Sequence, residues 1–401
     1  MPAELIDLEE ARARVLAAVP AHLPAEPVPL PRALGRVLAD DVVAADDVPG
    51  FDNSAMDGYA VRAADTAGAP VDLPLAGESR AGHPAAAPLP PGAAMAISTG
   101  AMLPEGANAV VRLEDTEPRG GIVAVGVTVE PGRDVRRAGD DVEAGSTVLR
   151  AGARLGAAEL GVLASVGVAE AACTRRPRVA LLTTGDELIG PGEPRVPGSV
   201  RDTNGVSIAG LVLEAGAELA SATRVADEPE ATGAALREGL RADVVVACGG
   251  VSVGQHDHVK PALEELGVAP AFWGVALRPG KPTWFGTRGD TLVFGLPGNP
   301  VSAMVTFHLF VRPALLALTG ADRSRTVAEA IMDEPYAKTP GRAHAVRCML
   351  EARDDGWHVR PTGPQGSHVL TSMLGAGALA LLPADRGDVP AGERVEIELL
   401  P

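Results

Sequence analysis

The chain has 401 residues, of which 46% are hydrophobic and 22% are charged, and its formal net charge is −17 at pH 7. This length exceeds what one hydrophobic core normally serves, so we expect about two to four domains. The negative charge argues against general binding to nucleic acids or membrane surfaces, because the average field repels phosphate groups. The sequence has no uninterrupted apolar run long enough to cross a bilayer.

The cysteines indicate the compartment. Cys173, Cys248 and Cys348 are odd in number and far apart in the sequence. They form neither a disulfide framework nor a zinc-ligand pattern, which favours a reducing environment. The N-terminal segment is acidic and has helical periodicity, unlike a secretory signal peptide. We therefore expect a cytoplasmic protein.

The first part of the chain predicts two kinds of structure. Alternating apolar residues between glycine and proline turns predict short strands and a β-rich domain over residues 28–141. A helical pattern over residues 155–167 stops at Gly167. We assign residues 1–27 and 142–177 to a helical linker and dimerisation region.

Residues 178–322 alternate continuous apolar strands with helices, which predicts a parallel, doubly wound α/β domain. Asp202 or Thr203 is available to cap one of these helices. Residues 323–401 contain short strands and predict a separate small β domain. The fold class is therefore a multidomain α/β plus β protein.

Four glycine-containing turns follow the expected strands of the α/β domain. In open α/β sheets, ligands bind beyond the carboxyl ends of the strands. Glycine turns aim backbone amides at one point, and a helix that starts beside them favours an anion. One such turn is commonly an ordinary connection, but four together indicate an anion site. They span residues 183–187, 249–254, 278–282 and 296–302.

Charged residues in these turns indicate a phosphate and a metal. Prolines flank Arg278 and Lys281, which suits a rigid grip on an oxyanion, although a solvated surface turn is the alternative. Carboxylates near an anion site favour Mg²⁺ that bridges them to phosphate oxygens. The carboxylates near the strand ends are Asp186, Glu187, Asp227 and Asp257.

His256 and His258 flank Asp257 in the sequence QHDHVK. On a strand the two imidazoles would share a face and could bind a transition metal. At a helix start they do not, and no third ligand lies near in the sequence. We favour a phosphate-binding loop in which Asp257 is the candidate Mg²⁺ ligand, although Asp257 could simply cap the helix that follows.

The β-rich domain has three polar loops. The loop over residues 48–65 contains Asp52 and Asp57, and a second loop contains Thr99 and Gly100. The third loop, residues 132–145, combines Arg133, Arg136 and Arg137 with Asp140 and Asp141, and this local cluster of cations counters the acidic average of the chain. Taken alone, each loop is better explained as a solvated surface.

Taken together, the motifs resemble those of the molybdopterin molybdenumtransferase family, the bacterial MoeA proteins, and the C-terminal region of gephyrin. The resemblance covers essentially the whole chain. The motifs are FDNSAMDGYAVR (51–62), STGAMLPEGANAVVRLED (98–115), VRRAGDD (135–141), TTGDEL (183–188), RDTNG (201–205), CGGVSVGQHDHVK (248–260), LRPGKPTWFG (277–286), GLPGNPVSA (295–303) and GPQGSH (363–368).

The resemblance implies an elongated homodimer with four domains per subunit. The α/β domain would bind molybdopterin, and the chain would end in a small β-barrel. The reaction would insert molybdate into adenylyl-molybdopterin and release AMP, with Mg²⁺ as cofactor. The site would lie between the α/β domain of one subunit and the N-terminal region of the other.

The resemblance also implies roles for particular residues. Arg278 stands where relatives often have lysine, and His256 and His258 inherit no role. Glu187 and Asp257 would bind the metal. The catalytic carboxylates would be Asp57, Asp141, Glu187, Asp227 and Asp257. The ligand contacts would be Thr99, Arg137, Thr184, Gly185, Gly249, Gly250, Ser252, Gly254, Arg278, Gly280, Lys281, Pro297, Gly298, Asn299, Pro300, Ser302 and Ser367.

Two other functions are compatible with these motifs. One is a non-catalytic molybdopterin carrier or scaffold, and the other is the adenylyltransferase that makes the substrate. Retention of all five carboxylates and Lys281 favours catalysis over the scaffold. The N-terminal and C-terminal domains argue against the adenylyltransferase, which is usually a single domain. Molybdopterin adenylyltransferase and molybdoenzyme-maturation proteins would then be partners, and tungstate is an alternative to molybdate.

Overall fold

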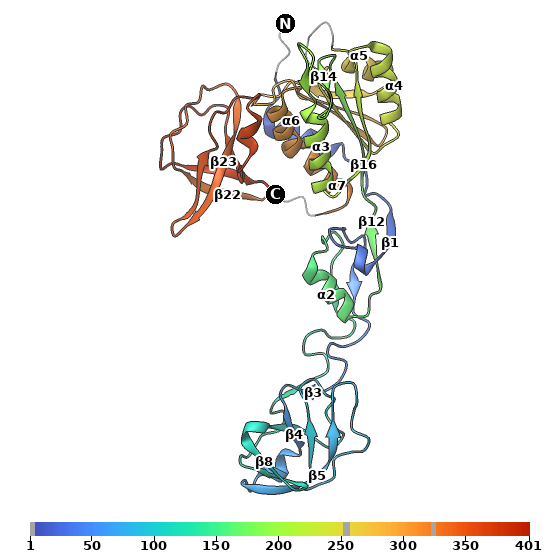
Figure 1. Cartoon of the computed structure of the whole chain (residues 1–401), viewed down its shortest axis with the longest axis vertical. Coiled ribbons are helices and arrows are strands. Elements are labelled where there is room, and N and C mark those ends of the chain that lie inside the picture. The colour runs from blue at the N-terminus through green and yellow to red at the C-terminus, as the bar shows by residue number, and fades with distance from the viewer. Residues whose placement is uncertain (1–4, 252–256, 322–325) are drawn as a thin grey trace.

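The computed structural model of the chain describes residues 5–251, 257–321 and 326–401. Figure 1 shows an elongated molecule. The α/β domain and a C-terminal β-barrel lie side by side at one end, and a β-rich domain lies at the far end. A narrow module that contains helix α2 connects the two ends.

The domain at the far end, which we call the distal domain, is built on a six-stranded sheet in the order β7-β4-β6-β5-β9-β8. Its core includes Tyr59, Leu73 and Val111, which are all buried. Gly58 is required in this sheet, because a Cβ atom there would lie 2.0 Å from the carbonyl oxygen of Val111. The strands are β4 (Gly58–Val61), β5 (Val71–Ser79), β6 (Ala94–Ile97), β7 (Ala109–Arg112), β8 (Thr116–Arg119) and β9 (Ile122–Val125).

The connecting module has its own small core. Strand β1 (Ala25–Pro29) pairs antiparallel with β12 (Glu170–Thr174), so the chain leaves and returns through one two-stranded ribbon. Helix α2 (Ala157–Ser165) covers this ribbon through the fully buried Leu163, and Cys173 lies in the same cluster. The ribbon places the distal domain away from the α/β domain (Figure 1).

Helix α1 (Leu8–Ala17) does not pack in the connecting module, where we had grouped residues 1–27. Its apolar stripe of Leu8, Ala11 and Val15 is buried in the same cluster as Phe310 of the α/β domain. An amphipathic helix needs a large apolar surface to cover its stripe, and the α/β core provides more than the small module does. Asp7 caps this helix by accepting a hydrogen bond from the Glu9 amide at 2.8 Å.

The α/β domain contains a six-stranded sheet in the order β16-β13-β17-β21-β20-β18. The chain runs from β13 outward to β16 and then returns to β17 on the other side of β13, so the strand order reverses between β13 and β17. Separate apolar clusters cover the two faces, one with α3 and the other with α4 and α5, as a doubly wound fold requires. The parallel strands and these helices are β13 (Arg178–Thr184), β16 (Glu218–Val225), β17 (Val244–Cys248), β21 (Thr291–Leu296), α3 (Thr203–Glu214), α4 (Pro229–Gly239) and α5 (Val259–Glu265).

The sheet is mixed rather than wholly parallel. Strand β20 (Trp284–Arg288) pairs antiparallel with β21, and β18 (Ala269–Trp273) pairs antiparallel with β20. The turn between β20 and β21 contains Gly289 at φ 55° and is too short for a crossover helix. Our expectation of a parallel sheet therefore holds for the four strands around the reversal and is wrong for this edge.

One continuous helix, Pro300–Leu318, follows β21 and comprises α6 (Pro300–Thr306), the π-helical turn η4 (Phe307–Val311) and α7 (Arg312–Leu318). Its length and its mean hydropathy of 1.7 would allow it to cross a membrane. However, 72% of this segment is buried inside the protein, against the α/β sheet. It is the central core helix of the domain.

The C-terminal domain is a closed barrel, because β23 pairs with both β24 and β25. Closure leaves no free sheet edge in the small domain. Strand β19 (Leu277–Arg278) of the α/β domain pairs in parallel with β23, which joins the two domains. The barrel strands are β22 (Val327–Met332), β23 (Ala343–Arg353), β24 (Gly356–Pro361), β25 (Ala378–Leu382) and β26 (Arg394–Leu399).

Candidate active site

A cavity of about 930 Å³ lies beyond the carboxyl ends of β13, β17 and β21, where the strand order reverses. Three adjacent parallel strands end at this edge, so the turns that follow them converge. The cavity is therefore the site that the strand pattern predicted. The predicted site residues that line it are Thr184, Gly185, Glu187, Asp227, Gly249, Gly250, Asp257, Pro297, Gly298, Asn299 and Pro300.

The glycine turn after β17 forms one wall of the cavity. Gly249 and Gly250 adopt φ values of 92° and 64°, in the left-handed region that favours glycine. A Cβ atom on either glycine would lie 3.0 Å from the Thr184 hydroxyl oxygen, so that hydroxyl packs directly against the turn. Thr184 is 8% exposed, and its hydroxyl has no hydrogen-bond partner among the described residues. A buried, unpartnered hydroxyl here fits a site that is completed by a ligand.

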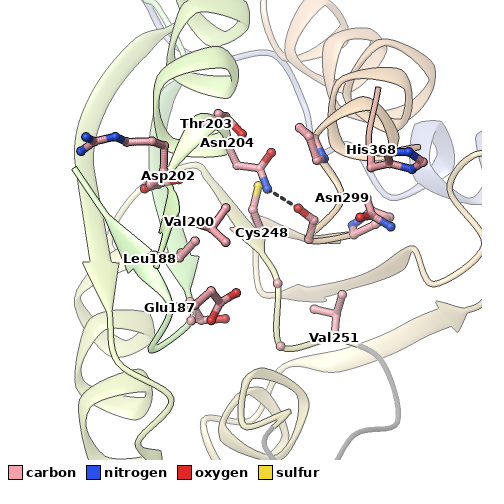
Figure 2. Close-up of a pocket in the computed structure, with 18 of the residues that line it drawn as sticks. Glu187, Leu188, Val200, Asp202, Thr203, Asn204, Cys248, Val251, Asn299 and His368 are labelled. Carbon is pink, nitrogen blue, oxygen red and sulfur yellow. Dashed lines mark hydrogen bonds between the residues drawn. The ribbon is translucent and has the colours of Figure 1, made fainter. Parts of the chain in front are cut away.

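Hydrogen bonds at the start of α3 hold a second wall of the cavity in place. Asp202 caps this helix by accepting a hydrogen bond from the Gly205 amide at 2.8 Å, and it accepts a second from the Thr183 hydroxyl at 2.7 Å. Asn204 donates a side-chain hydrogen bond to the Gly298 carbonyl at 2.8 Å, as Figure 2 shows. These bonds link β13, α3 and the turn after β21 into one frame. The side-chain amide oxygen of Asn204 is buried and has no hydrogen-bond partner among the described residues.

Three predicted carboxylates, Glu187, Asp227 and Asp257, line the cavity. The Asp227 amide donates to the Asp186 carboxylate at 2.9 Å. Burial raises the pKa of Asp227 above its usual value, and the neighbouring charges of Asp186 and Glu187 raise it further. A raised carboxylate pKa in a cleft is typical of a functional site, and a bound cation would relieve the repulsion.

Cys248 also lines the cavity but is not a candidate nucleophile. Its side chain is 2% exposed, and burial raises its thiol pKa far above the ordinary value. Cys248 is therefore part of the packed wall.

Two arginines that we did not single out line the cavity. Arg201 donates hydrogen bonds to the carbonyls of Gly190 and Glu193, which braces the segment between β14 (Leu188–Ile189) and β15 (Val200–Arg201). Arg195 forms no hydrogen bond or ion pair with any residue in the described part of the chain. It is thus an available cation in a cavity with several carboxylates. Its proline-rich and glycine-rich surroundings give no motif by which the sequence could have indicated it.

The barrel contributes to the cavity through the segment that contains Ser367 and His368. The Ser367 carbonyl accepts a hydrogen bond from the Val301 amide, near the start of α6, at 3.3 Å. Ser367 does not line the cavity, whereas His368 does, and Figure 2 shows its imidazole near Asn299. Of these two neighbours, the one that lines the cavity is His368, which we did not single out from the sequence.

The predicted cationic turn lies beside the cavity rather than in its lining. Arg278 and Lys281 are exposed and do not line the cavity, although Pro282 does. The turn is held by the pairing of Arg278 with His344 of the barrel, which fixes its direction. Gly280 also does not line it, because it packs against Thr306; a Cβ atom there would lie 2.5 Å from the Thr306 methyl group.

Ser302 is 4% exposed inside the core helix and does not line the cavity. Its backbone carbonyl accepts a hydrogen bond from the Thr306 hydroxyl at 2.7 Å. Ser252, Gly254 and His256 lie outside the described residues. His258 is the residue that directly precedes α5, and its side chain does not cap that helix.

The four predicted residues of the distal domain form a separate group in which Asp57 accepts a hydrogen bond from the Thr99 amide at 2.7 Å. Arg137 pairs with Asp52, since β3 (Asn53–Ser54) and β10 (Val135–Arg136) bring the two loops together. Asp141 lies in the same loop as Arg137, and its amide donates to Val48. None of the four lines the cavity of its own chain, from which the connecting module separates them (Figure 1).

Among the residues that the structure describes, no group of three or more His, Cys, Asp or Glu side chains is arranged to hold a metal ion. Mg²⁺ commonly uses only one or two carboxylates and takes its other ligands from substrate phosphates and water.

Comparison with known proteins covers the whole chain. Residues 6–167 match the MoeA N-terminal region (domain I and II), residues 180–317 a probable molybdopterin binding domain, and residues 329–400 the MoeA C-terminal region (domain IV). The Haemophilus influenzae molybdopterin molybdenumtransferase is 38% identical over 98% of both chains. Gephyrin from Dictyostelium discoideum is 32% identical over 94% of this chain and 59% of its own length.

The solved structure of the molybdopterin biosynthesis MoeA protein from Pyrococcus horikoshii OT3 has the same architecture. It is 31% identical in sequence, covers 99% of this chain and 100% of its own, and superposes with a TM-score of 0.85. The four motif-bearing turns, the distal domain and the closed barrel thus occur in one known arrangement. The chain belongs to the molybdopterin molybdenumtransferase (MoeA) family.

Proposed function

We propose that this protein inserts molybdenum into molybdopterin, with adenylyl-molybdopterin and molybdate as substrates and AMP as a product. The observation that supports this most is the cavity at the reversal of strand order, inside the region that matches a molybdopterin-binding domain. A glycine turn, an unpartnered buried hydroxyl and an available arginine suit an anionic ligand with a phosphate group.

The cavity residues divide into two roles in this proposal. The Gly249–Gly250 turn and Arg195 bind and orient the phosphate of the substrate, since both line the cavity and Arg195 has no competing partner among the described residues. The side-chain amide oxygen of Asn204 and the Thr184 hydroxyl form hydrogen bonds with the organic part of the ligand and hold it in place. Orientation of this kind accounts for much of the catalysis of phosphoryl transfer and related reactions.

The residues present fit a Mg²⁺ ion. Glu187 and Asp257 would hold it, because both carboxylates line the cavity; Asp227, whose pKa is raised mainly by burial and also by the charges of Asp186 and Glu187, lines it too. When bound, Mg²⁺ would neutralise charge that develops on phosphate oxygens. Asp227, a half-buried carboxylate with a raised pKa, is suited to hold a proton near the reacting groups.

We further propose that the protein acts as a homodimer. In this arrangement Asp57, Thr99, Arg137 and Asp141 of one subunit complete the cavity of the other. The reason is that these residues form a polar group that is separated from the cavity of their own chain. Exposed apolar side chains on α3, Val206 at 61% and Leu213 at 58%, lie seven positions apart on one face and suit an interface between copies.

The cytoplasm is the proposed location, because the three cysteines are buried and free, which suits a reducing compartment. Partners in this proposal are the molybdopterin adenylyltransferase that supplies the substrate and the molybdoenzyme-maturation proteins that accept the product. Such transfers would keep a reactive ligand away from water.

The direct test is an insertion assay with the full-length protein, adenylyl-molybdopterin, molybdate and MgCl₂. We expect molybdenum cofactor and AMP to form together, and we expect Asp257→Asn to reduce turnover strongly. Unchanged turnover in Asp257→Asn would contradict its assigned role. Incubation with ATP and molybdopterin separates the adenylyltransferase alternative, because no adenylylation should occur. A carrier would bind the substrate without releasing AMP.

A further inference from the structure

Trp273 contacts the chain on both sides of the segment that joins the glycine turn to α5. Its indole N–H donates a hydrogen bond to the carbonyl oxygen of Val251 at 2.9 Å. The ammonium nitrogen of Lys260 lies 4.7 Å from the centroid of the Trp273 ring, within the range of a cation–π interaction. One side chain on the edge strand β18 therefore interacts with two points nine residues apart.

Both points are close to the cavity. Val251 lines it directly and follows the Gly249–Gly250 turn. Lys260 lies in the first turn of α5, three residues after Asp257, which also lines the cavity. A shift of either contact point would therefore move a wall of the cavity or the carboxylate of Asp257.

The surrounding packing gives the Trp273 contacts a rigid base. Val251 is 2% exposed and belongs to the same buried cluster as Val259 of α5 and Trp284 of β20. Its side chain packs against Gly295, where a Cβ atom would lie 2.6 Å from the Val251 methyl group. Val251 thus cannot move inward, and the indole hydrogen bond opposes outward movement of its carbonyl.

The choice of lysine at position 260 is informative in this chain. The sequence has three lysines among 35 basic residues, so basic surface positions are almost always arginine. Lys260 is partly buried beside the indole ring rather than at an exposed position. Both lysine and arginine interact with an aromatic face, so the charge over the ring is the property that a test must isolate.

We propose that Trp273 is a positioning residue for the active site, which together with Lys260 sets the place of the Gly249–Gly250 turn relative to Asp257. The proposal rests on the proposed function of this cavity. Trp273 acts through Val251 and Lys260 and does not line the cavity. Its loss should therefore impair catalysis without removing any ligand-contacting group.

Three variants of the full-length protein test this. Trp273→Phe keeps a ring but loses the N–H donor, and we expect kcat/KM for molybdenum insertion to fall about fivefold, the effect of one net hydrogen bond. Lys260→Met keeps the apolar stem but loses the charge, with an expected fall of about threefold. Lys260→Arg keeps the charge and should restore activity to within twofold of wild type.

A spectroscopic measurement separates positioning from general stability. AMP should change the tryptophan emission of the wild-type protein, and this change should be absent in Trp273→Phe. Trp357→Phe is the matched control, because Trp357 is 40% exposed on the barrel and should leave both the AMP response and kcat/KM unchanged.

Wild-type kcat/KM in both Trp273→Phe and Lys260→Met would overturn the proposal, as would a Lys260→Arg variant no better than Lys260→Met. If Trp273→Phe fails to fold, the two Lys260 variants decide. A wild-type protein without insertion activity would instead contradict the proposed function. In that case the AMP-dependent emission change still tests the placement of Trp273 beside the ligand site.

Discussion

Eleven predicted site residues of the α/β domain line one cavity, whereas those of the distal domain lie at the other end of the molecule. In the α/β domain, three parallel strands end side by side, so residues far apart in sequence meet. In the distal domain, Asp57 and Arg137 are instead engaged locally, with the Thr99 amide and with Asp52. The comparison teaches that the topology of one chain brings the α/β residues together but leaves the distal residues apart, which is why we propose that a second copy completes the site.

The largest expected effect comes from the glycine turn of the cavity. In Gly250→Ala the new Cβ atom would lie 2.7 Å from a Val259 methyl group and 3.0 Å from the Thr184 hydroxyl, at φ 64°. Left-handed strain and the displacement of these neighbours should lower kcat/KM for insertion about 100-fold.

The control is Gly192→Ala, in the segment between β14 and β15, where a Cβ atom has no neighbour within 4 Å. It should stay within twofold of wild type. Near-normal activity in Gly250→Ala would show that the turn does not face the ligand. The claim that the cavity of the α/β domain binds the ligand would then be contradicted.

Removal of the Arg195 charge, which also belongs to the cavity, should have a smaller effect on activity. It is exposed, so removal of its charge in Arg195→Gln should raise the KM for adenylyl-molybdopterin only about fivefold, with kcat little changed. The effect should shrink as salt rises, since salt screens exposed charges. Arg237→Gln on the outer surface of α4 removes the same charge and should have no effect; equal effects of both variants would contradict a specific contact.

The variant Asp134→Asn tests whether some polar residues of the distal domain stabilise the fold without contributing to activity. Arg112 donates two hydrogen bonds of 2.9 Å to the Asp134 carboxylate and, as the main cause, lowers its pKa. Asp134→Asn keeps a residue that tolerates the observed φ of 51° but weakens this pair. We expect the Tm of the protein at pH 7 to fall by roughly 2–5 °C, with kcat/KM unchanged at 25 °C.

The pH dependence of this stability difference has a defined sign. Because the folded-state pKa of Asp134 lies below the unfolded value of about 3.9, its stabilisation is present above that pH. It is lost as the pH falls through the folded-state pKa. Calorimetry should therefore show the wild type and Asp134→Asn converging in acid. A loss of activity in Asp134→Asn without loss of stability would instead place Asp134 in the site.

The sequence predicted the fold well where local patterns decide it. Continuous apolar strands such as residues 178–184 and the glycine stop at Gly167 have one structural interpretation. The position of α1 was not predictable, because its apolar stripe of Leu8, Ala11 and Val15 does not indicate which core it covers. The antiparallel strand β20 was missed because a buried apolar strand has the same pattern in either direction.

The site was predictable to the level of segments rather than side chains. Glu187, Gly249 and Asn299 follow strands that end at one edge, so their convergence follows from topology. Ser367 and His368 are neighbours, and only the three-dimensional path of the barrel segment decides which one faces the cavity. Arg195 lies in a segment without periodicity, so no sequence signal marked it.

The most direct test of the composite site is subunit complementation between Asp57→Asn, in the distal domain, and Glu187→Gln, in the cavity. Each variant alone should be inactive. When equal amounts are unfolded together and reassembled, random pairing gives half heterodimers, each with one intact site, so about a quarter of wild-type activity should return. Mixing Glu187→Gln with Asp227→Asn, both in the cavity, should restore nothing. Recovery only in the first mixture is the result that we predict; no recovery in that mixture would contradict a site shared between subunits.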